Sequence, residues 1–307
     1  MRNASSEILI SDTFEADEGV HIPVMLDEVI YYMEPKPGDF MIDGTLGGGG
    51  HARELISRIS PHGKFLGVDR DPDVVLRLNL SSPGVDVHIE NANYSEIPEV
   101  MERLGFMKAD GLLLDLGFSS IQLGEGKGFS FMKDEPLVMT YSPDDEPLSY
   151  ALRRMSRNEI KDIIAVSGEK YAGKIADAIW SAERKHRIEM TGELVEVIRS
   201  AVPRNYEKGR IHPATRSFLA FRIFINKEFE HMEKALRSIP EILKPGGRAV
   251  IITFQSLEDR IVKERFRELA KEGKAEILTK KPIPATYEES ERNPRSRSAK
   301  IRAIKII

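Results

Sequence analysis

The 307-residue sequence contains no cysteine. Disulfides, thiolate metal sites and a cysteine nucleophile are therefore excluded. No apolar run reaches the roughly 18 residues of a membrane-spanning helix, and the N-terminus lacks the charged-then-apolar pattern of a signal peptide. His51 is a single histidine with no cluster of metal-ligating residues around it in the sequence, so we expect no metal. These absences favour a cytoplasmic protein without a membrane partner.

The sequence also lacks a strong charge of one sign. Its net charge is −4, with 31% charged residues, so a nucleic-acid partner would have to use local basic stretches. Residues 292–305 carry basic side chains and no acid, and residues 204–216 are basic apart from Glu207. Each stretch is equally explained as solvated surface. The alternative that we pursue is that Arg216, Arg295 and Arg297 contact RNA.

Short apolar runs alternate with helical patterns in the first part of the chain. Residues 1–20 are polar without a clear period and are expected to form a flexible leader. Runs at 39–43, 64–69, 85–89 and 110–115 predict strands, and patterns at 23–33, 51–59, 71–80 and 97–104 predict helices. This βαβ alternation predicts a parallel sheet with helices on both faces.

The alternation stops after residue 123. Helical patterns near 147–166, 168–185 and 191–202 follow without a convincing strand, and they predict an inserted helical domain at 124–212 that recognises the substrate. A long helical pattern at 213–243 then leads to a turn at 245–247, a strand at 248–254 and a helix at 256–272. Strands at 275–278 and 299–307 close the chain. The main domain is thus expected to be discontinuous, with residues 21–123 and 213–307.

A glycine loop follows the first expected strand, running from Asp43 through four consecutive glycines to His51. Ligands of open α/β sheets bind at the carboxyl ends of the strands, where glycines let the backbone approach a cofactor closely. Two alternatives are a purely structural turn and a nicotinamide dinucleotide site. In the second, the pyrophosphate would bind at the helix N-terminus. Because Asp43 would repel a pyrophosphate but attract an ammonium, the loop around Gly47 favours S-adenosylmethionine.

Acidic residues end two more strands. Asp69 ends the second strand, where a carboxylate can accept both hydroxyls of a ribose. Asp115 ends the fourth strand, which lies beside the first across the switch point, so it would face the transferred group; a turn cap is the alternative. Tyr94 follows the third strand, where it would lie against an adenine or serve in packing.

Motifs along nearly the whole chain resemble the small-subunit ribosomal RNA methyltransferase H family. They are His21-Ile22-Pro23-Val24-Met25, the loop at 43–51, Asp69-Arg70-Asp71-Pro72, residues 115–122, Gly128-Phe129-Ser130-Phe131, His212-Pro213-Ala214-Thr215-Arg216, Pro245-Gly246-Gly247-Arg248, Ser256-Leu257-Glu258-Asp259-Arg260 and Asn293-Pro294-Arg295-Ser296-Arg297-Ser298.

The resemblance implies a Rossmann-like, seven-stranded class I methyltransferase sheet with an inserted all-α domain. It implies S-adenosylmethionine-dependent methylation of the exocyclic N4 amine of a cytidine in the decoding region of small-subunit (16S) ribosomal RNA. The cofactor contacts that it implies are Gly49, Gly50, His51, Asp69, Tyr94, Asp115 and Gln122.

The chain departs from the family in two motifs. Where the family usually reads Pro-Leu-Asp-Met-Arg-Met-Asp, residues 136–142 read Pro-Leu-Val-Met-Thr-Tyr-Ser, so that Val138, Thr140 and Ser142 replace charged groups. Where the family usually reads Ser-Phe-His-Ser, residues 253–256 read Thr-Phe-Gln-Ser, with Gln255 in place of the histidine. Cofactor binding should be unaffected, whereas substrate positioning, rate or substrate identity could change.

These considerations give three functional hypotheses. The first is an RNA cytidine methyltransferase in which Asp115 acts electrostatically at the reacting centre, Phe118 or Phe254 stacks on the flipped base and Gln255 orients it. The second, motivated by the departures, is a ribosome-assembly protein that binds S-adenosylmethionine and RNA but has weak or no activity. The third is a small-molecule methyltransferase, against which the basic stretches and the insertion argue.

Overall fold

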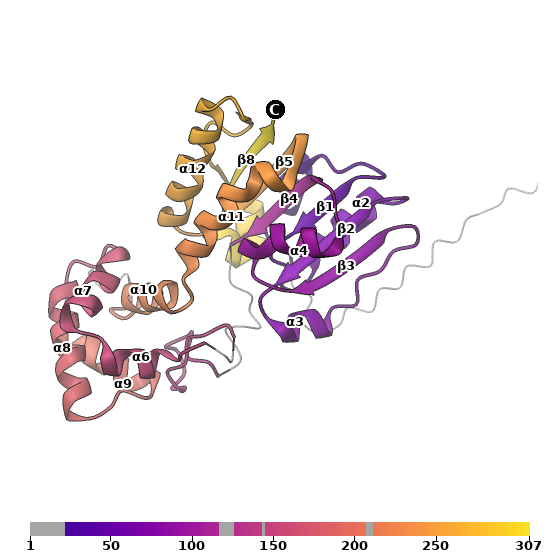
Figure 1. Ribbon diagram of the computed structural model, residues 1–307. Helices are drawn as coiled ribbons and strands as arrows, with labels where there is room; N and C mark the ends of the chain where they lie inside the picture. Colours follow the sequence, from indigo (N-terminus) through magenta and orange to yellow (C-terminus); the bar gives the residue numbers. More distant parts are fainter. Residues whose placement is uncertain (1–21, 117–125, 143–144, 207–210) are drawn as a thin grey trace, which may run out of the picture.

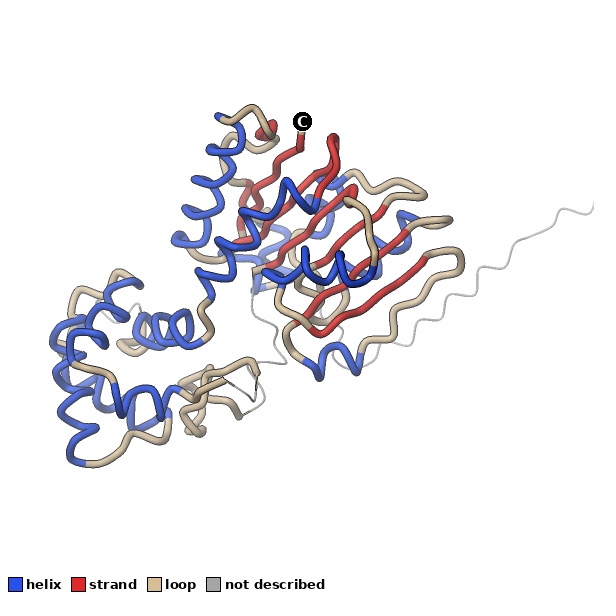
Figure 2. The backbone as a smooth tube through the Cα atoms, viewed as in Figure 1, coloured by secondary structure: helices blue, strands red, loops and turns tan. Residues whose placement is uncertain are grey.

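The computed structural model describes residues 22–116, 126–142, 145–206 and 211–307 (Figure 1). The whole of the expected leader at 1–20, together with Phe118 and Gln122, lies outside these residues. Within them the chain forms a twisted sheet covered by helices and a separate group of helices beside it (Figures 1 and 2). None of the described helices combines the length and the apolar composition needed to cross a membrane.

The sheet follows the expected Rossmann-like pattern. Its path is β3-β2-β1-β4-β5-β8-β6, with β7 paired to β8. The pairs β1–β2, β2–β3, β1–β4 and β4–β5 are parallel, whereas β8 is antiparallel to β5, β6 and β7. The strands are β1 (Phe40–Asp43), β2 (Lys64–Asp69), β3 (Asp86–Asn91), β4 (Ala109–Asp115), β5 (Leu243–Thr253), β6 (Ala275–Ile277), β7 (Ile283–Pro284) and β8 (Lys300–Ile306). The placement of β1 between β2 and β4 confirms the predicted switch point.

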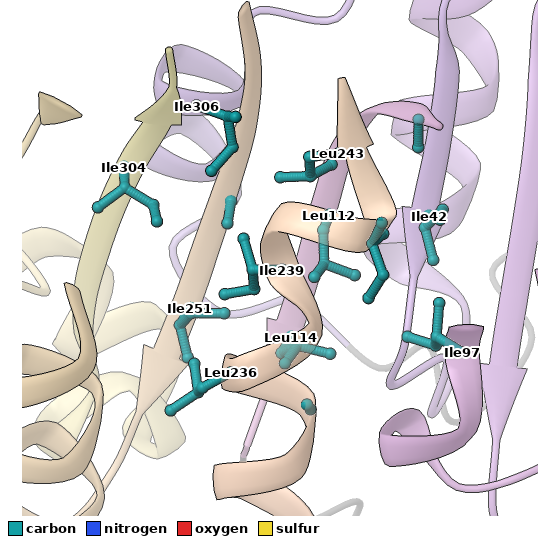
Figure 3. Packing of buried hydrophobic residues seen from close by; sticks show 14 of the residues in the cluster. Ile42, Ile97, Leu112, Leu114, Leu236, Ile239, Leu243, Ile251, Ile304 and Ile306 are labelled. Atoms are coloured by element: carbon teal, nitrogen blue, oxygen red, sulfur yellow. The ribbon is translucent and has the colours of Figure 1, made fainter. Parts of the chain in front are cut away.

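Helices cover both faces of this sheet because its central strands bury side chains on both sides. Leu112 and Leu114 of β4 belong to one core, and Leu113 between them belongs to the other. On the first face, Leu236 and Ile239 pack against this core (Figure 3). The helices of this domain are α1 (Leu26–Met33), α2 (Gly50–Ile59), α3 (Pro72–Arg77), η1 (Tyr94–Glu96), α4 (Ile97–Leu104), α11 (Glu228–Ile242), α12 (Ser256–Lys271), α13 (Tyr287–Arg292) and η3 (Pro294–Ser298).

The helices between β4 and α11 have a hydrophobic core of their own. They are α6 (Leu148–Arg154), α7 (Arg157–Val166), α8 (Ala172–Lys185), α9 (Thr191–Ala201) and α10 (Thr215–Ile225). Ala214, Phe218 and Phe221, from the start of α10 and within it, are buried in this third core. The expected domain boundary at residue 212 therefore does not coincide with the boundary between the cores, which lies between α10 and α11.

Two predicted helices proved to be broken. The single helix expected over 213–243 is wrong, because α10 ends at Ile225, Asn226 is its C-cap, and Lys227 takes a left-handed conformation, φ 50°, before α11. The single helix expected over 147–166 is also wrong, because Ser156 begins a new helix with a capping box to Glu159. The first helix begins at Leu26 rather than Pro23, since Met25 is left-handed.

Candidate functional site

A cavity opens at the carboxyl ends of the parallel strands, where ligands of such sheets bind. Its wall includes the glycine loop, the ends of β2 and β4, the first turns of η1, α11 and α12, and one residue of η3. The sequence-predicted residues that line it are Gly47, Gly50, His51, Asp69, Tyr94, Asp115, Phe254 and Arg295. Asp43, Gly49 and Gln255 lie close by in the chain but do not line it.

The glycine loop is shaped by close packing. A Cβ atom on Gly44 would lie 2.5 Å from Leu114 Cδ2, and one on Gly50 would lie 2.9 Å from Pro23 Cδ. Gly47 and Gly49 have positive φ values of 49° and 74°, which side chains rarely adopt. Gly49 precedes α2 and offers no side chain to cap the N–H groups of its first turn. The loop thus brings bare backbone to the cavity wall at the start of a helix.

Asp69 is buried beside this loop. Its Oδ2 accepts a hydrogen bond from Gly47 N at 2.9 Å, and its Oδ1 accepts one from Asp71 N at 2.9 Å. Burial raises the pKa of Asp69, and these two backbone donors oppose the rise. Each carboxylate oxygen has lone pairs beyond those used by the backbone, so the group can still accept hydroxyl donors from the cavity.

Asp43, His51 and Asp115 form a polar group behind and beside the loop. Asp43 Oδ1 accepts a hydrogen bond from Thr45 N at 3.0 Å, while its Oδ2 is buried without a hydrogen-bond partner. Burial raises the pKa of Asp43 to about 6. His51 Nε2 donates to Val24 O at 2.9 Å, and its Nδ1 lies 4.0 Å from Asp115 Oδ2. Asp43 is not among the residues that line the cavity, so its expected contact with the cofactor stays a prediction.

A half-buried aromatic and polar wall faces the loop. Tyr94 lies in η1, and the side chain of Asn93 caps this turn by accepting a hydrogen bond from Ser95 N at 2.9 Å. His231 Nδ1 is 2.9 Å from Ser95 Oγ, and burial together with Arg70 lowers the pKa of His231. This wall offers ring faces and hydrogen-bonding groups to a flat heterocycle.

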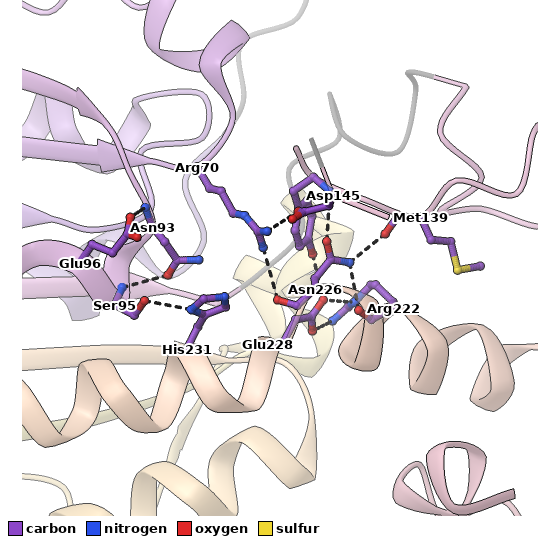
Figure 4. Close-up of polar contacts among 11 residues, drawn as sticks. Arg70, Asn93, Ser95, Glu96, Met139, Asp145, Arg222, Asn226, Glu228 and His231 are labelled. Atoms are coloured by element: carbon purple, nitrogen blue, oxygen red, sulfur yellow. Dashed lines mark hydrogen bonds and ion pairs between the residues drawn. The ribbon is translucent and has the colours of Figure 1, made fainter. Parts of the chain in front are cut away.

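The opposite wall is a network of buried charges at the junction of the two parts of the chain (Figure 4). Arg222 donates to Glu228 from Nε at 2.7 Å and from Nη2 at 2.9 Å, and Tyr141 Oη donates to Glu228 Oε1 at 3.0 Å. Asn226 links the end of α10 to the segment at Met139 and Tyr141, because its Oδ1 accepts a hydrogen bond from Tyr141 N and its Nδ2 donates one to Met139 O. The pKa of Tyr141 is raised by burial and by Glu228.

The end of β5 completes the cavity with Phe254 and Glu258. Glu258 Oε2 accepts hydrogen bonds from Phe254 N at 2.9 Å and Gln255 N at 3.1 Å. Gln255 is the N-cap of α12, and its Oε1 is buried without a partner. The residues that reach the cavity from this segment are therefore Phe254 and Glu258, on either side of Gln255.

The three arginines predicted to bind RNA lie in different surroundings. Arg295 and Arg297 are exposed in η3, with Arg295 at the cavity. Arg216 lies on α10, where its Nη1 donates to Tyr206 Oη at 2.8 Å and is 3.8 Å from the buried Glu169 carboxylate. Arg216 thus takes part in the internal contacts of the helical core.

Sequence reasoning missed the contributions of α10 and α11. Arg222, Asn226, Glu228 and His231 line the cavity from a segment that reads only as a long helix. A polar or charged residue on an otherwise apolar helical face was the available signal. Within the described ranges no group of three or more potential ligands is placed to hold a metal ion.

Comparisons with known proteins extend these findings. The sequence model of the MraW methylase family matches residues 18–307. A small-subunit ribosomal RNA methyltransferase H from Pelobacter propionicus is 41% identical over 305 residues, covering 92% of this chain and 97% of that protein. The protein of the same name from Clostridium botulinum is 39% identical over 307 residues, covering 94% and 99%.

Solved structures show weaker likeness. A methyltransferase homologue from Pyrococcus horikoshii has a TM-score of 0.41 at 15% identity, covering 90% of this chain and 64% of that one. Aeropyrum pernix fibrillarin with natively bound S-adenosyl-L-methionine has a TM-score of 0.38 at 12% identity, covering 88% and 67%. The family model matches the sequence over residues 18–307, which is nearly the whole chain. On that match, the chain belongs to the MraW methylase family.

Proposed function

We propose that this protein transfers a methyl group from S-adenosylmethionine to the RNA of the small ribosomal subunit, in the cytoplasm. The observation that carries the proposal is the cavity in which Asp69, the glycine loop and Asp115 come together at the ends of β2, β1 and β4. The names of relatives about 40% identical over nearly their whole length support the RNA substrate.

The residues of the cavity fit the parts of this cofactor. Asp69 would accept hydrogen bonds from the ribose hydroxyls, which matches its buried carboxylate and its retained lone pairs. The uncapped first turn of α2 would bind the methionine carboxylate, since helix N-termini favour anions. Tyr94 and His231 would border the adenine. When bound, the cofactor supplies an electrophilic methyl group on a sulfonium.

The finer proposal is that the acceptor is the exocyclic N4 amine of a cytidine in the decoding region. This amine is a poor nucleophile because its lone pair is delocalised into the ring. Hydrogen-bond acceptors on its two protons favour the pyramidal form, and Asp115, which lines the cavity at the end of β4, would provide one. The base must leave its stack to enter the cavity, where Phe254 offers a ring face.

The protein's own contribution is mainly alignment. Holding the amine at near-attack distance supplies several kcal/mol in such displacements. The buried pair of Arg222 and Glu228, fixed by Tyr141, makes one wall rigid. The exposed Arg295, which lines the cavity, and the exposed Arg297 on the same 3-10 helix would contact the phosphates of the RNA.

The alternative is an assembly protein that binds S-adenosylmethionine and RNA with weak or no methyl transfer. It is favoured by Val138, Thr140, Ser142 and Gln255, which replace polar or charged groups of the family pattern. In the described structure the cavity wall at this motif is made by Tyr141, whose hydroxyl binds Glu228. Because this contact holds the cavity wall in place despite the replaced residues, it favours the methyltransferase over the assembly protein.

The decisive experiment uses labelled S-adenosylmethionine and small subunits from a strain that lacks the gene. The methyltransferase hypothesis predicts label in the subunits, absent with an Asp115→Asn enzyme, and a single methylated cytidine on mapping. Free ribosomal RNA serves as the second substrate. Cofactor and RNA binding without any label would establish the assembly protein instead, and label on another base or atom would refute the cytidine N4 assignment.

A further inference from the structure

Glu258 is a buried carboxyl group in the cavity wall. The roles proposed above for binding the cofactor and holding the base do not use it. It is only 4% exposed, yet it lines the cavity beside Phe254. It lies where β5 passes into α12, and β5 pairs with β4 up to Asp115, opposite Ile252. Glu258 is thus at the edge of the sheet where the target amine is expected.

Among the described residues, the hydrogen bonds to Glu258 all go to one of its oxygens. Oε2 accepts both backbone donors that precede α12, from Phe254 N and Gln255 N. No hydrogen bond to Oε1 is found among the described residues, and Oε1 is not among the buried atoms without a partner. A capping carboxylate on an ordinary helix is exposed, as Glu159 of α7 is. Glu258 instead presents a second acceptor atom to the cavity.

The charges around Glu258 set its proton affinity. Burial raises the pKa of Glu258 to about 7, and Glu228 of α11 adds to the rise. Arg222 of α10 and the two backbone donors oppose it. Tyr94 of η1 also interacts electrostatically with the Glu258 carboxyl. Burial raises the pKa of Tyr94, so the tyrosine hydroxyl stays neutral near pH 7. A proton acceptor works best when it titrates near the working pH.

We propose that Oε1 of Glu258 accepts a hydrogen bond from the target amine and takes up its proton during methyl transfer. This inference rests on the proposed function. As the amine nitrogen forms its bond to the methyl carbon, the bond from that carbon to sulfur breaks, leaving a neutral thioether. The nitrogen becomes cationic and passes one proton to the Glu258 carboxylate, which later releases it to solvent.

The test is the single-turnover rate of methyl transfer to unmodified small subunits between about pH 5.5 and 9. The parent rate should rise with pH through about 7 and then level, because the carboxylate form is required. Glu258→Gln keeps an oxygen that can cap α12 but cannot take a proton. It should lower the rate about 100-fold and remove the inflection, while the Kd for S-adenosylmethionine and the KM for subunits stay within about twofold.

Glu159→Gln is the matched control, because Glu159 holds the same capping position in α7 and lies outside the cavity. It should leave the rate and the pH profile unchanged. An active parent whose Glu258→Gln variant keeps the full rate and inflection would overturn the inference and leave the proposed function standing. A loss of cofactor binding equal to the loss of rate would also overturn it, since Glu258 would then only hold the fold. A parent that transfers no methyl group would overturn both.

Discussion

Arg222 and Glu228 form two parallel hydrogen bonds, of 2.7 and 2.9 Å, across the break between α10 and α11. Arg222 lies on the last helix of the helical core, and Glu228 begins the helix that covers the sheet. Because both side chains are largely buried, this pair joins the two parts of the chain at the wall of the cavity.

Removal of one partner of this pair should destabilise the protein. Arg222→Ala would leave the Glu228 carboxylate buried without its counter-charge, which typically costs about 3–5 kcal/mol. The free energy of unfolding from urea titrations, followed by the fluorescence of Trp180, measures this loss. Arg237→Ala, which removes an exposed pair with Glu233, is the control and should change it by less than about 1 kcal/mol. An equal effect of the two variants would contradict the prediction.

Asp69→Ala should weaken the binding of S-adenosylmethionine by about 1.5–3 kcal/mol, the range for hydrogen bonds that involve a charged group. The carboxylate also accepts a hydrogen bond from Gly47 N, so part of the loss would come from a looser glycine loop. Calorimetry on the folded variant measures the affinity. Unchanged affinity would rule out Asp69 as a ribose ligand.

The arginines should separate into two groups. Arg295→Ala with Arg297→Ala should lower RNA affinity and reduce the salt slope by up to about one unit per lost phosphate contact, because both are exposed. Arg216→Ala should instead lower stability, because it leaves the buried Glu169 carboxylate without its cation. RNA titrations at several salt concentrations test this division, and a reduced slope for Arg216→Ala alone would reverse it.

Asp43→Asn should make the fold less sensitive to pH. The pKa of Asp43 is about 6 when folded against 3.8 for the free side chain, so its contribution to stability is present below about pH 4 and lost as pH rises through 6. Asparagine can still accept the hydrogen bond from Thr45 N. The gain in unfolding free energy of the variant over the parent should therefore be larger at pH 8 than at pH 4, by about 3 kcal/mol. Parallel stability curves would show that Asp43 is not buried as a charge.

Gln255→His should change the single-turnover rate by less than about tenfold, because Gln255 lies outside the cavity wall and serves as the N-cap of α12. Glutamine cannot take up a proton near neutral pH, whereas histidine can. A rise of about a hundredfold or more would show that a base is needed at this position and would contradict a role confined to the start of α12. Asp115→Asn is the negative control, and its full activity would refute the assignment of the site itself.

The sequence by itself determined the sheet and the cofactor side of the site. Short apolar runs that end in Asp43, Asp69 and Asp115 predict parallel strands, and the carboxyl ends of such strands meet at one edge. The glycine loop between the first strand and its helix requires conformations that only glycine adopts freely, so its position can be predicted from the sequence alone. Local rules suffice here because each residue's role depends on its own strand end or turn.

The tertiary structure alone decided the opposite wall. Tyr141, Arg222 and Glu228 are far from the glycine loop in sequence, and only the packing of α10 and α11 brings them to the cavity. The break at Asn226 is likewise invisible to periodicity, because its side chain is held by the distant Met139 carbonyl. Whether an arginine lines the cavity, as Arg295 does, or pairs with a buried carboxylate, as Arg216 does with Glu169, depends on the surroundings that folding supplies. Burial then sets the proton affinity of Glu258, since desolvation is a property of the whole fold.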